Sequence, residues 1–292
     1  MFHDQRELGV SVVRVLAVGA AGQRAGLAVR ALVEAGVDVR GLVHSAGKER
    51  VARANGAAET VVADLGDHDA LVAALRGVDG VFHVIPAFAP DEAGMGVAMV
   101  RAAVDAGVGR FVFSSVYHPS LTSLSNHRAK QPAEQALYDS HLRFTILQPA
   151  MFMSQLDGLV GAARDKGVVS GPYSADSRMS YVDYRDVAEV VALAFTTDRL
   201  DNGTFELSAP GMYSRVDLAA LLTDIVGRPV RAESTPAALP DSMPAPMREG
   251  LMRMLAHYDE HGFHGGNDLV LEAILGRRPT GVPDYLAEVA AR

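Results

Sequence analysis

Residues 12–26 read VVRVLAVGAAGQRAG, and this stretch decides the fold. The seven residues before Gly19 are apolar except for Arg14, and four of them are valine, which is typical of a buried strand that a glycine ends. Residues 27–34 (LAVRALVE) then carry apolar side chains at helical spacing, and Gly36 follows as a stop signal. The stretch therefore predicts a strand, a glycine turn and a helix.

The alternation of strand and helix continues to about residue 150. Further strands are expected at residues 37–43, 60–63, 81–85, 111–113 and 144–147, and helices at 71–75 and 95–106. Parallel strands need crossovers, and a helix is the usual one, so the pattern predicts an α/β fold with a Rossmann-type, doubly wound parallel sheet. A helix at 187–195, capped by Asp186, and a strand at 204–207 would follow. The proline-rich stretch 236–246 is expected to be an exposed linker or lid loop, with mostly helical residues after it.

The composition indicates a globular chain. The 292 residues include 49% hydrophobic and 21% charged side chains, which is enough apolar surface for a sizeable core. Cysteine is absent, and this excludes disulfides, thiolate metal ligands and a cysteine nucleophile. The formal charge of −8 argues against a nucleic-acid binder, and the apolar runs are too short to span a membrane. Residues 1–10 lack the apolar stretch of a secretory signal, so we expect a cytoplasmic protein.

The turn between the first strand and the first helix has the spacing G-x-x-G-x-x-A, from Gly19 to Ala25. Glycines allow a tight turn, small side chains let backbone amides approach a pyrophosphate, and the helix N-terminus adds favourable partial charge. Such a turn can also serve packing alone, but its place as the first strand-to-helix turn favours a dinucleotide. The residues expected to hold the diphosphate are Gly19, Ala21, Gly22, Gln23 and Arg24.

The end of the second strand discriminates between NAD and NADP. A carboxylate there would bind the adenosine ribose, whereas cations accommodate an extra phosphate. The sequence has no acid at this point and offers His44, Ser45 and Lys48 together with Arg24, so NADP(H) is favoured, with NAD(H) as the alternative coenzyme. The opposing interpretation is that Lys48 only begins a solvated helix, and that His44, with an ordinary pKa of about 6.5, is a weak cation.

Two other strand ends add expected contacts. Asp64 and Leu65 follow the third strand, where they would meet the adenine, although Asp64 could equally cap the next helix. Val84 lies at the end of the fourth strand and Pro86 and Phe88 follow it. These residues would wall the cleft, with Phe88 on the substrate side. Open α/β sheets bind ligands at the carboxyl ends of their strands, so these residues are expected along one edge.

The order and spacing of several motifs resemble the NmrA-like family of atypical short-chain dehydrogenase/reductases. The matching segments are VGAAGQRAG, VRGLVHS, GVDGVFHVIP, GVGRFVFSSV, FTILQPAMFM, YVDYRDVAEV and ILGRRPTGVPDYL. The resemblance implies a Rossmann domain that binds NAD(P), formed by residues 12–155 together with 181–210. It also implies a smaller, mostly helical substrate lobe formed by residues 156–180 and 211–292, with residues 1–11 as an N-terminal extension.

In the wider superfamily a serine and a Tyr-x-x-x-Lys motif carry the proton chemistry, and the resemblance places Ser114, Ser115 and Lys130 in matching positions. It implies that Lys130 binds the coenzyme ribose or, as in the isoflavone-reductase-like group, takes part in proton transfer. Asn126 stands where the tyrosine belongs, four residues before Lys130, and asparagine cannot titrate. The standard relay is therefore missing. The alternative interpretation of Lys130 is a surface lysine that begins a helix.

Tyr117, on the loop after the fifth strand, offers a substitute phenol or forms only part of the cleft wall. We therefore assign catalysis to Lys130, Ser115 and Tyr117. His118 and His127 are further proton carriers near the same cleft, although each is more often a plain loop histidine.

The residues after the sixth strand are expected beside the nicotinamide. By resemblance Pro149 and Met151 would flank the ring through their backbone. The substrate side would be lined by Phe88, Tyr117, His118, Phe152 and Met153. The residues from Met151 to Met153 would alternatively serve only core packing between the lobes. No metal site is expected, because the histidines at 257, 261 and 264 lack an H-E-x-x-H order and glycines interrupt their helix.

Three interpretations of the function remain open. The first is an NADP(H)-dependent reductase that transfers hydride to a small hydrophobic quinone, enone, imine or carbonyl substrate. The second is a non-catalytic NAD(P)-sensing regulator with a protein partner, which the residue at position 126 favours. The third is a non-redox isomerase or cyclase that keeps the nucleotide as a structural element. None of them needs a nucleic-acid or membrane partner.

Overall fold

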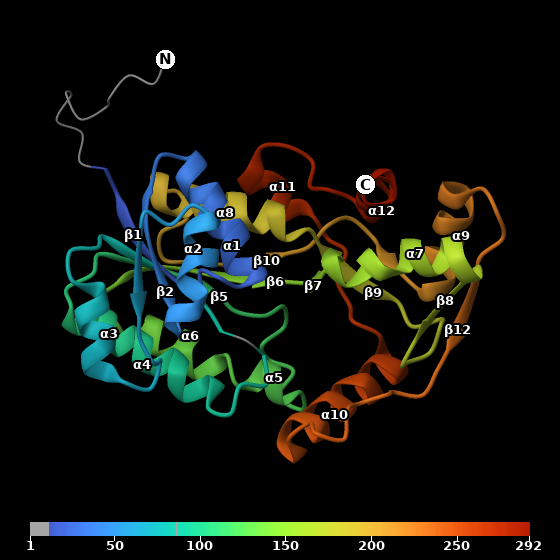
Figure 1. Cartoon of the computed structure of the whole chain (residues 1–292), viewed down its shortest axis with the longest axis horizontal. Helices are drawn as coiled ribbons and strands as arrows, with labels where there is room; N and C mark the ends of the chain where they lie inside the picture. Colours follow the sequence, from blue (N-terminus) through green and yellow to red (C-terminus); the bar gives the residue numbers. More distant parts are fainter. Residues whose placement is uncertain (1–11, 86) are drawn as a thin grey trace.

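The computed structural model describes residues 12–85 and 87–292 (Figure 1). The expected N-terminal extension, residues 1–11, and the predicted cofactor contact Pro86 lie outside the described residues. The main sheet has seven strands in the order β10-β6-β5-β4-β1-β2-β3. Their bounds are β1 Arg14–Val18, β2 Asp38–Val43, β3 Glu59–Val62, β4 Gly80–Val84, β5 Arg110–Ser114, β6 Arg143–Pro149 and β10 Gly203–Leu207.

Every pairing in this sheet is parallel, so the predicted doubly wound sheet is confirmed. Strand β1 pairs with β2 on one side and with β4 on the other. The strand order therefore reverses beside β1, and such a switch point is where open α/β sheets bind their ligands.

Helices cover both faces of the sheet (Figure 1). One face carries α1 (Gln23–Glu34) and α8 (Tyr184–Thr196), which pack against each other, with α2 (Glu49–Ala54) and α11 (Leu269–Leu275) nearby. The other face carries α3 (His68–Leu75), α4 (Glu92–Asp105) and α6 (Gln131–Tyr138). The short helix η2 spans Ala46–Lys48, and α5 spans Ser125–Arg128.

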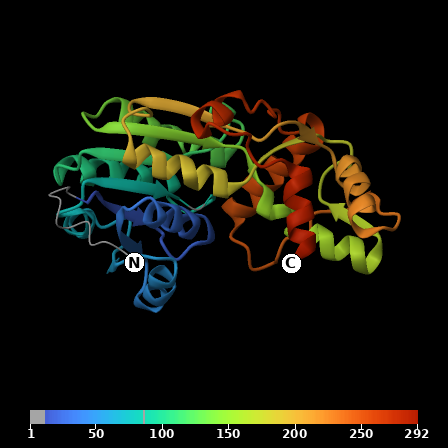
Figure 2. The same cartoon turned by 90° about the horizontal axis from the view of Figure 1, so that it is seen from above.

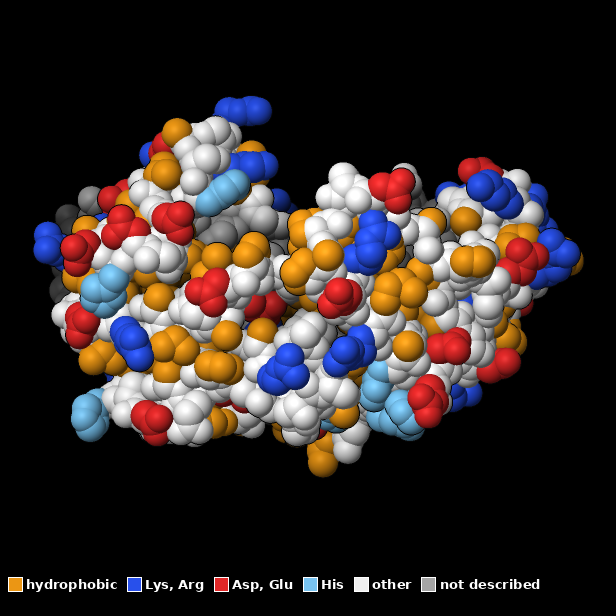
Figure 3. Space-filling view, turned by 90° about the horizontal axis from the view of Figure 1, so that it is seen from below, with side chains coloured by type: hydrophobic (Ala, Val, Ile, Leu, Met, Phe, Trp, Pro, Cys, Tyr) orange, Lys and Arg blue, Asp and Glu red, His pale blue; other side chains and the backbone are white. Residues whose placement is uncertain are grey.

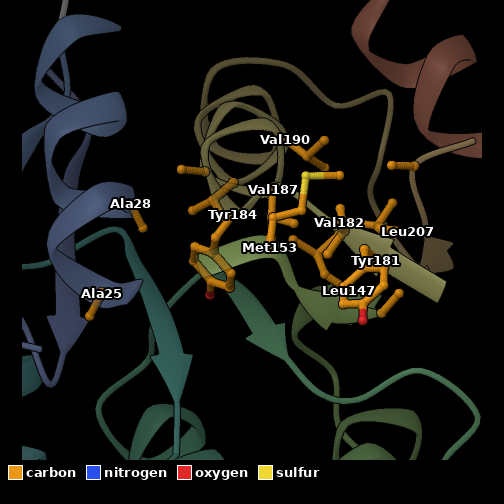
Figure 4. Close-up of a cluster of buried hydrophobic side chains, with 14 of the residues drawn as sticks. Ala25, Ala28, Leu147, Met153, Tyr181, Val182, Tyr184, Val187, Val190 and Leu207 are labelled. Atoms are coloured by element: carbon orange, nitrogen blue, oxygen red, sulfur yellow. The ribbon is translucent and has the colours of Figure 1, made fainter. Parts of the chain in front are cut away.

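The two faces form two separate hydrophobic cores, because the sheet is apolar on both sides. Figure 4 shows part of the first core, where Ala25 and Ala28 of α1 lie across from Tyr184, Val187 and Val190 of α8. In the second core, a Cβ atom added at Gly96 would lie 2.7 Å from the Cβ of Ala133. A glycine there lets α4 approach α6 closely.

Two predicted helix caps are wrong. The helix predicted at 187–195 begins earlier, at Tyr184, and Asp183 caps it by accepting a hydrogen bond from the backbone of Arg185. Asp186 lies inside α8 instead, where it is buried and accepts hydrogen bonds from Arg277 and the backbone of Thr280. Asp67 rather than Asp64 caps α3, and the Asp64 carboxylate accepts from the backbone of Gly66. Periodicity locates a helix but leaves its first turn uncertain, since several nearby acids can cap.

The remaining elements form a smaller part beside the sheet (Figure 2). A three-stranded sheet joins β7 (Met151–Phe152), β9 (Met179–Val182) and β11 (Met212–Tyr213), and a two-stranded one joins β8 (Val168–Gly171) and β12 (Arg231–Ser234). The helices are η3 (Met153–Leu156), α7 (Asp157–Lys166), α9 (Arg215–Val226), α10 (Ala245–His261) and α12 (Val282–Ala291). The expected substrate lobe is thus a mixture of helices and small sheets, and its predicted residue ranges stay a prediction.

The loop predicted at 236–246 is confirmed up to residue 244, where α10 takes over at Ala245. Among the described residues, no helix is both long and apolar enough to cross a bilayer. The face of the molecule in Figure 3 carries acidic and basic side chains interspersed with apolar ones.

Candidate functional site

A cleft of about 350 Å³ lies at the carboxyl ends of β4, β5 and β6, beside the glycine turn that follows β1. Its walls come from strand ends on one side and from the smaller part of the molecule on the other. The lining includes Gly19, Gly22, Gln23, Arg24, Val84, Ile85, Phe88, Ser114, Ser115, Asn126, His127, Lys130, Pro149, Met151, Phe152, Gln155, Met254, Tyr258 and Phe263. Most of the residues predicted for the diphosphate and nicotinamide therefore lie together.

The glycine turn has the geometry of an anion cradle. Gly19 has a φ of +69°, which glycine tolerates and other residues rarely adopt. The backbone N–H of Gly22 donates to the oxygen of Gly19 at 2.7 Å, and a Cβ atom at Gly22 would lie only 3.1 Å from that oxygen. Gly22 is the N-cap of α1, and no side chain of the described residues caps the helix amides. The first turn of α1 is therefore available to a phosphate group.

Arg24 adds a positive charge at the same place. Its guanidinium lies over the ring of Phe152, 4.3 Å from the ring centre. Its Nε atom is buried and has no hydrogen-bond partner within the described part of the chain. Burial lowers the pKa of Arg24. A buried guanidinium nitrogen without a partner beside an open helix N-terminus fits a bound diphosphate, so the residues present suit the coenzyme that the sequence predicts.

The residues predicted for the adenosine half lie outside this cleft. His44, Ser45 and Lys48 follow β2, where His44 and Lys48 are exposed and Ser45 is half-buried. Strand β2 is next to β1, and the Gly19 amide donates to the oxygen of Leu42 at 2.9 Å. These three side chains therefore flank the glycine turn on the side away from the cleft.

Three further predicted coenzyme contacts also lie outside the cleft. Ala21 lines a neighbouring hollow together with Gly22 and Arg24. Asp64 and Leu65 follow β3, the edge strand on the β2 side of the sheet. The contacts of all three with the coenzyme stay a prediction.

Ser114 and Ser115 end β5 in a buried hydrogen-bond network. The Ser115 hydroxyl donates to Oε1 of Glu134 at 2.5 Å, and the same oxygen accepts from the amide of Gln148 at 2.9 Å. The Tyr184 hydroxyl donates to Oγ of Ser114 at 3.1 Å, and burial raises the pKa of Tyr184 to about 12. Because the proton of Ser115 is directed at Glu134, its oxygen offers lone pairs rather than a proton to the cleft.

Lys130 is not a surface residue, which corrects one interpretation of the sequence. Its side chain is 5% exposed, with Nζ 2.7 Å from Oε1 of Glu92 and a hydrogen bond to the oxygen of Ile85 at 3.2 Å. Burial lowers the pKa of Lys130, and the Glu92 carboxylate opposes that change. Oε2 of Glu92 also accepts from the backbone of Phe88, which has a φ of +63°. The pair thus shapes the loop after β4 that walls the cleft.

Asn126 and His127 lie on α5 at the same wall. The Oδ1 atom of Asn126 is buried and has no partner in the part of the chain that the structure describes, while Nδ2 lies 3.8 Å from the sulfur of Met254. His127 donates from Nδ1 to the oxygen of His118 at 3.0 Å, because a carbonyl can only accept. Burial lowers the pKa of His127, so its ring is mainly neutral at pH 7 and poorly suited as an acid.

Three residues predicted to line the cleft do not line it. Tyr117 is buried against His118 and Phe263, and burial raises its pKa. His118 has both ring nitrogens engaged, one 2.9 Å from Glu206 and the other 2.9 Å from the oxygen of residue 264. Met153 is fully buried in the core at the start of η3. These three residues lie close to cleft residues along the chain, but local turns direct their side chains away from the cleft.

Sequence reasoning missed several residues of the cleft, among them Gln155, Met254 and Phe263. Met254 and Tyr258 lie on one face of α10, four residues apart, and a helical spacing of apolar residues was a signal for this. Gln155 and Phe263 had no comparable signal, since Gln155 lies in the short helix η3 and Phe263 follows the end of α10. No group of three or more His, Asp or Glu side chains within the described ranges could hold a metal ion.

Comparisons with known proteins agree with this geometry. The NAD(P)H azoreductase of Xenophilus azovorans is 35% identical over 218 residues, which cover 74% of this chain and 75% of the relative. The structure of the Escherichia coli NADPH-dependent quinone oxidoreductase with NADPH has a TM-score of 0.81 at 21% identity, covering 95% of this chain and 99% of the other. NmrA, a negative transcriptional regulator with bound NADP, gives 0.80 at 18% identity and 96% coverage of both chains. The last two show likeness of fold alone.

A family model described as the NmrA-like family matches residues 12–286. This match covers nearly the whole chain, including the glycine turn, the strand ends and α10. The chain belongs to the NmrA-like family.

Proposed function

We propose that this protein is an NADPH-dependent reductase that transfers hydride to a small hydrophobic acceptor. The observation that carries the proposal is a single cleft in which the glycine turn and Arg24 face apolar side chains from α10 and the segment after β6. A coenzyme bound at the glycine turn and an acceptor bound against the apolar side chains would contact each other in this cleft. The azoreductase relative, at 35% identity, supports the reaction type.

In this proposal the chain's own residues bind and orient the coenzyme and the acceptor. The amides at the start of α1 and the guanidinium of Arg24 would hold the diphosphate. Pro149 and Met151 would form the surface against which the nicotinamide rests, and that ring, when bound, supplies the hydride. Phe88 and Phe152 would exclude water from the acceptor side.

The proton supply favours quinones over simple ketones. Asn126 cannot titrate, Ser115 gives its proton to Glu134, and Lys130 is held by Glu92. Hydride transfer to a ketone leaves an alkoxide, whose conjugate acid is roughly as weak as water at about 15.7, so an acid in the site is needed. Hydride transfer to a quinone leaves a phenolate, whose conjugate acid has a pKa of about 10, so water can supply the proton. We therefore expect an acceptor of the second kind.

NADPH is proposed as the preferred coenzyme. The carboxyl end of β2 presents His44, Ser45 and Lys48, and no acid stands among residues 44–48 to bind the ribose hydroxyls. NADH is expected to bind more weakly, because the extra phosphate is what these groups would recognise.

The test is NADPH oxidation against menadione, an azo dye and acetophenone, with fluorescence titration of NADPH in parallel. We expect turnover of the first two and little of the third. Gly22→Asp should weaken NADPH binding by about a hundredfold, because a carboxylate at the turn repels the diphosphate. Absence of oxidation with every acceptor, despite tight NADPH binding, would contradict the proposal.

A second candidate is a regulator that senses NAD(P) without turnover, and Asn126 is the observation that favours it. In that case NADPH would bind, no acceptor would be reduced, and a stable protein partner would be recovered by affinity capture. The acceptor panel separates the two functions directly.

A further inference from the structure

A second cavity adjoins the cleft inside the smaller part of the molecule. It has a volume of about 300 Å³ and shares Met151, Gln155, Met254 and Tyr258 with the cleft. We call it the inner chamber. Its other lining residues are Leu156, Leu159, Ser170, Gly171, Pro172, Tyr173, Met179, Tyr181, Arg215, Leu218, Leu251 and Leu255. The four shared side chains place the chamber directly behind the acceptor side of the cleft.

Arg215 is the one charged residue among the described residues that line the inner chamber. It is 6% exposed, and its guanidinium lies 4.7 Å from the centre of the Tyr173 ring. Nη1 donates to the backbone oxygens of Tyr173 at 2.9 Å and Glu233 at 3.3 Å. Within residues 12–85 and 87–292, Nε and Nη2 make no hydrogen bond, and no carboxylate lies within ion-pair distance of this side chain. A mostly buried cation without a carboxylate partner is costly, because burial removes much of its water without supplying an anion.

The nearby carboxylate of α9 is engaged elsewhere. Asp217 accepts from the backbone and hydroxyl of Ser214 at 2.9 Å in a capping box, and it pairs with Arg178 at 3.3 Å. Arg215 also stands in the first turn of α9, where the helix dipole disfavours a cation. Arg215 is therefore left without a carboxylate partner among the described residues.

The space for the guanidinium is built into the backbone. A Cβ atom at Gly171 would lie 2.3 Å from Nη2, 2.8 Å from Cζ and 2.9 Å from Nε of Arg215. Glycine at this position therefore lets the guanidinium lie against β8. Any larger residue would displace the charge from its place on the chamber wall.

The other polar side chains of the chamber, among them Tyr181 and Tyr258, can donate as well as accept hydrogen bonds. Tyr181 and Tyr258 are buried, and burial raises the pKa of each, so both hydroxyls stay protonated at neutral pH. Figure 4 shows the hydroxyl of Tyr181 pointing away from Val187 and Val190 of α8. Guanidinium and phenol groups together present N–H and O–H donors, which suit an oxyanion.

The geometry points to the inner chamber as a substrate subsite that binds an anionic group, a carboxylate or similar oxyanion, at the end of the acceptor remote from its reducible part. The apolar walls at Leu156, Leu218 and Met254 would contact the body of such a molecule, and the free edge of Arg215 would pair with its oxyanion. This inference rests on the proposed reductase function for the identity of the reducible part. The preferred acceptor would therefore be an elongated amphipathic molecule rather than a compact neutral one.

The test compares two acceptors that differ only at one end: a naphthoquinone with a short alkyl chain ending in a carboxylate, and its methyl ester. For the wild type, kcat/KM should be about tenfold higher for the carboxylate, because a charge-assisted hydrogen bond in a buried site is worth that factor. In Arg215→Met this ratio should fall to about one, and Arg215→Lys should retain part of it. Arg253→Met removes an exposed arginine from α10 and should leave the ratio unchanged.

Equilibrium binding separates this inference from the reductase proposal. The same two compounds are titrated into protein saturated with NADP⁺, so that no turnover is needed. Tighter binding of the carboxylate that disappears in Arg215→Met supports the subsite even when no acceptor is reduced. Equal affinities in the wild type, or a preference that survives in Arg215→Met, would overturn the inference while leaving the reductase function standing. Thermal melting of each variant checks that it is folded.

Discussion

Lys130 and Arg215 are buried to the same degree, at 5% and 6% exposure, yet the protein treats their charges differently. Lys130 lines the cleft and has a carboxylate, Glu92, at 2.7 Å. Arg215 lines the inner chamber, where its partners among the described residues are two backbone oxygens and an aromatic ring. The described residues thus neutralise the first charge and leave the second one open.

The presence or absence of an internal counter-ion distinguishes a structural cation from one that is open to a ligand. A buried charge with an internal counter-ion is already compensated, and its role is to position neighbours, here the loop that carries Phe88. A buried cation without an internal carboxylate can pair with the anionic group of a ligand. Substitutions that remove one partner at a time test this distinction.

The largest effect is expected from Glu92→Leu, which leaves Lys130 buried without its carboxylate. The free energy of unfolding should fall by about 3–5 kcal/mol, measured by urea denaturation at pH 7. The double variant with Lys130→Met should recover at least half of this loss, because the unpaired charge is then absent. If the double variant is as unstable as Glu92→Leu alone, the unpaired charge of Lys130 is not the cause of the lost stability.

A smaller effect, dependent on pH, is expected at His83. This side chain is fully buried on β4, stacked on Phe113, and neither ring nitrogen has a hydrogen-bond partner in the described chain. Burial, together with the Lys130 charge, lowers its pKa to about 3. The folded pKa lies below the unfolded value of about 6.5, so the unfolded state binds more protons between these values. Stability should be retained above pH 6.5 and lost as the pH falls, by about 2 kcal/mol at pH 5.

His83→Leu should remove that part of the pH dependence. Unfolding curves at pH 7, 6 and 5 for the variant and the wild type measure the difference in slope. Identical slopes would mean that His83 is not kept neutral by its surroundings. The result also bears on Lys130, because its charge is one cause of the low pKa of His83.

The smallest effect is expected for an exposed cation. Lys48→Met should weaken NADPH binding about three- to fivefold and leave NADH binding unchanged, since a solvent-exposed charge contributes roughly 1 kcal/mol or less. Arg50→Met, two residues away and also exposed, is the matched control. Equal loss for both coenzymes would contradict the assignment of Lys48 to the extra phosphate.

Much of the fold and part of the site could be predicted from the sequence. The strands of the main sheet follow from runs of apolar residues, and the glycine turn follows from spacing along a few residues. The side-chain directions of Tyr117, His118 and Met153 could not be predicted, because each depends on a local turn after a strand. The coenzyme contacts predicted at the ends of β2 and β3 remain predictions.

The sequence alone determined the succession of strands and helices along the chain, the glycine turn after β1 and the non-titrating residue Asn126, since each depends on near neighbours in the chain. Only the tertiary structure decided which buried cation has a counter-ion. Glu92 reaches Lys130 because α4 packs against α6, whereas Arg215 meets Tyr173 and Gly171 because α9 packs beside β8 and β12. Charges are compensated across space, so their pairing is set by packing rather than by spacing along the chain.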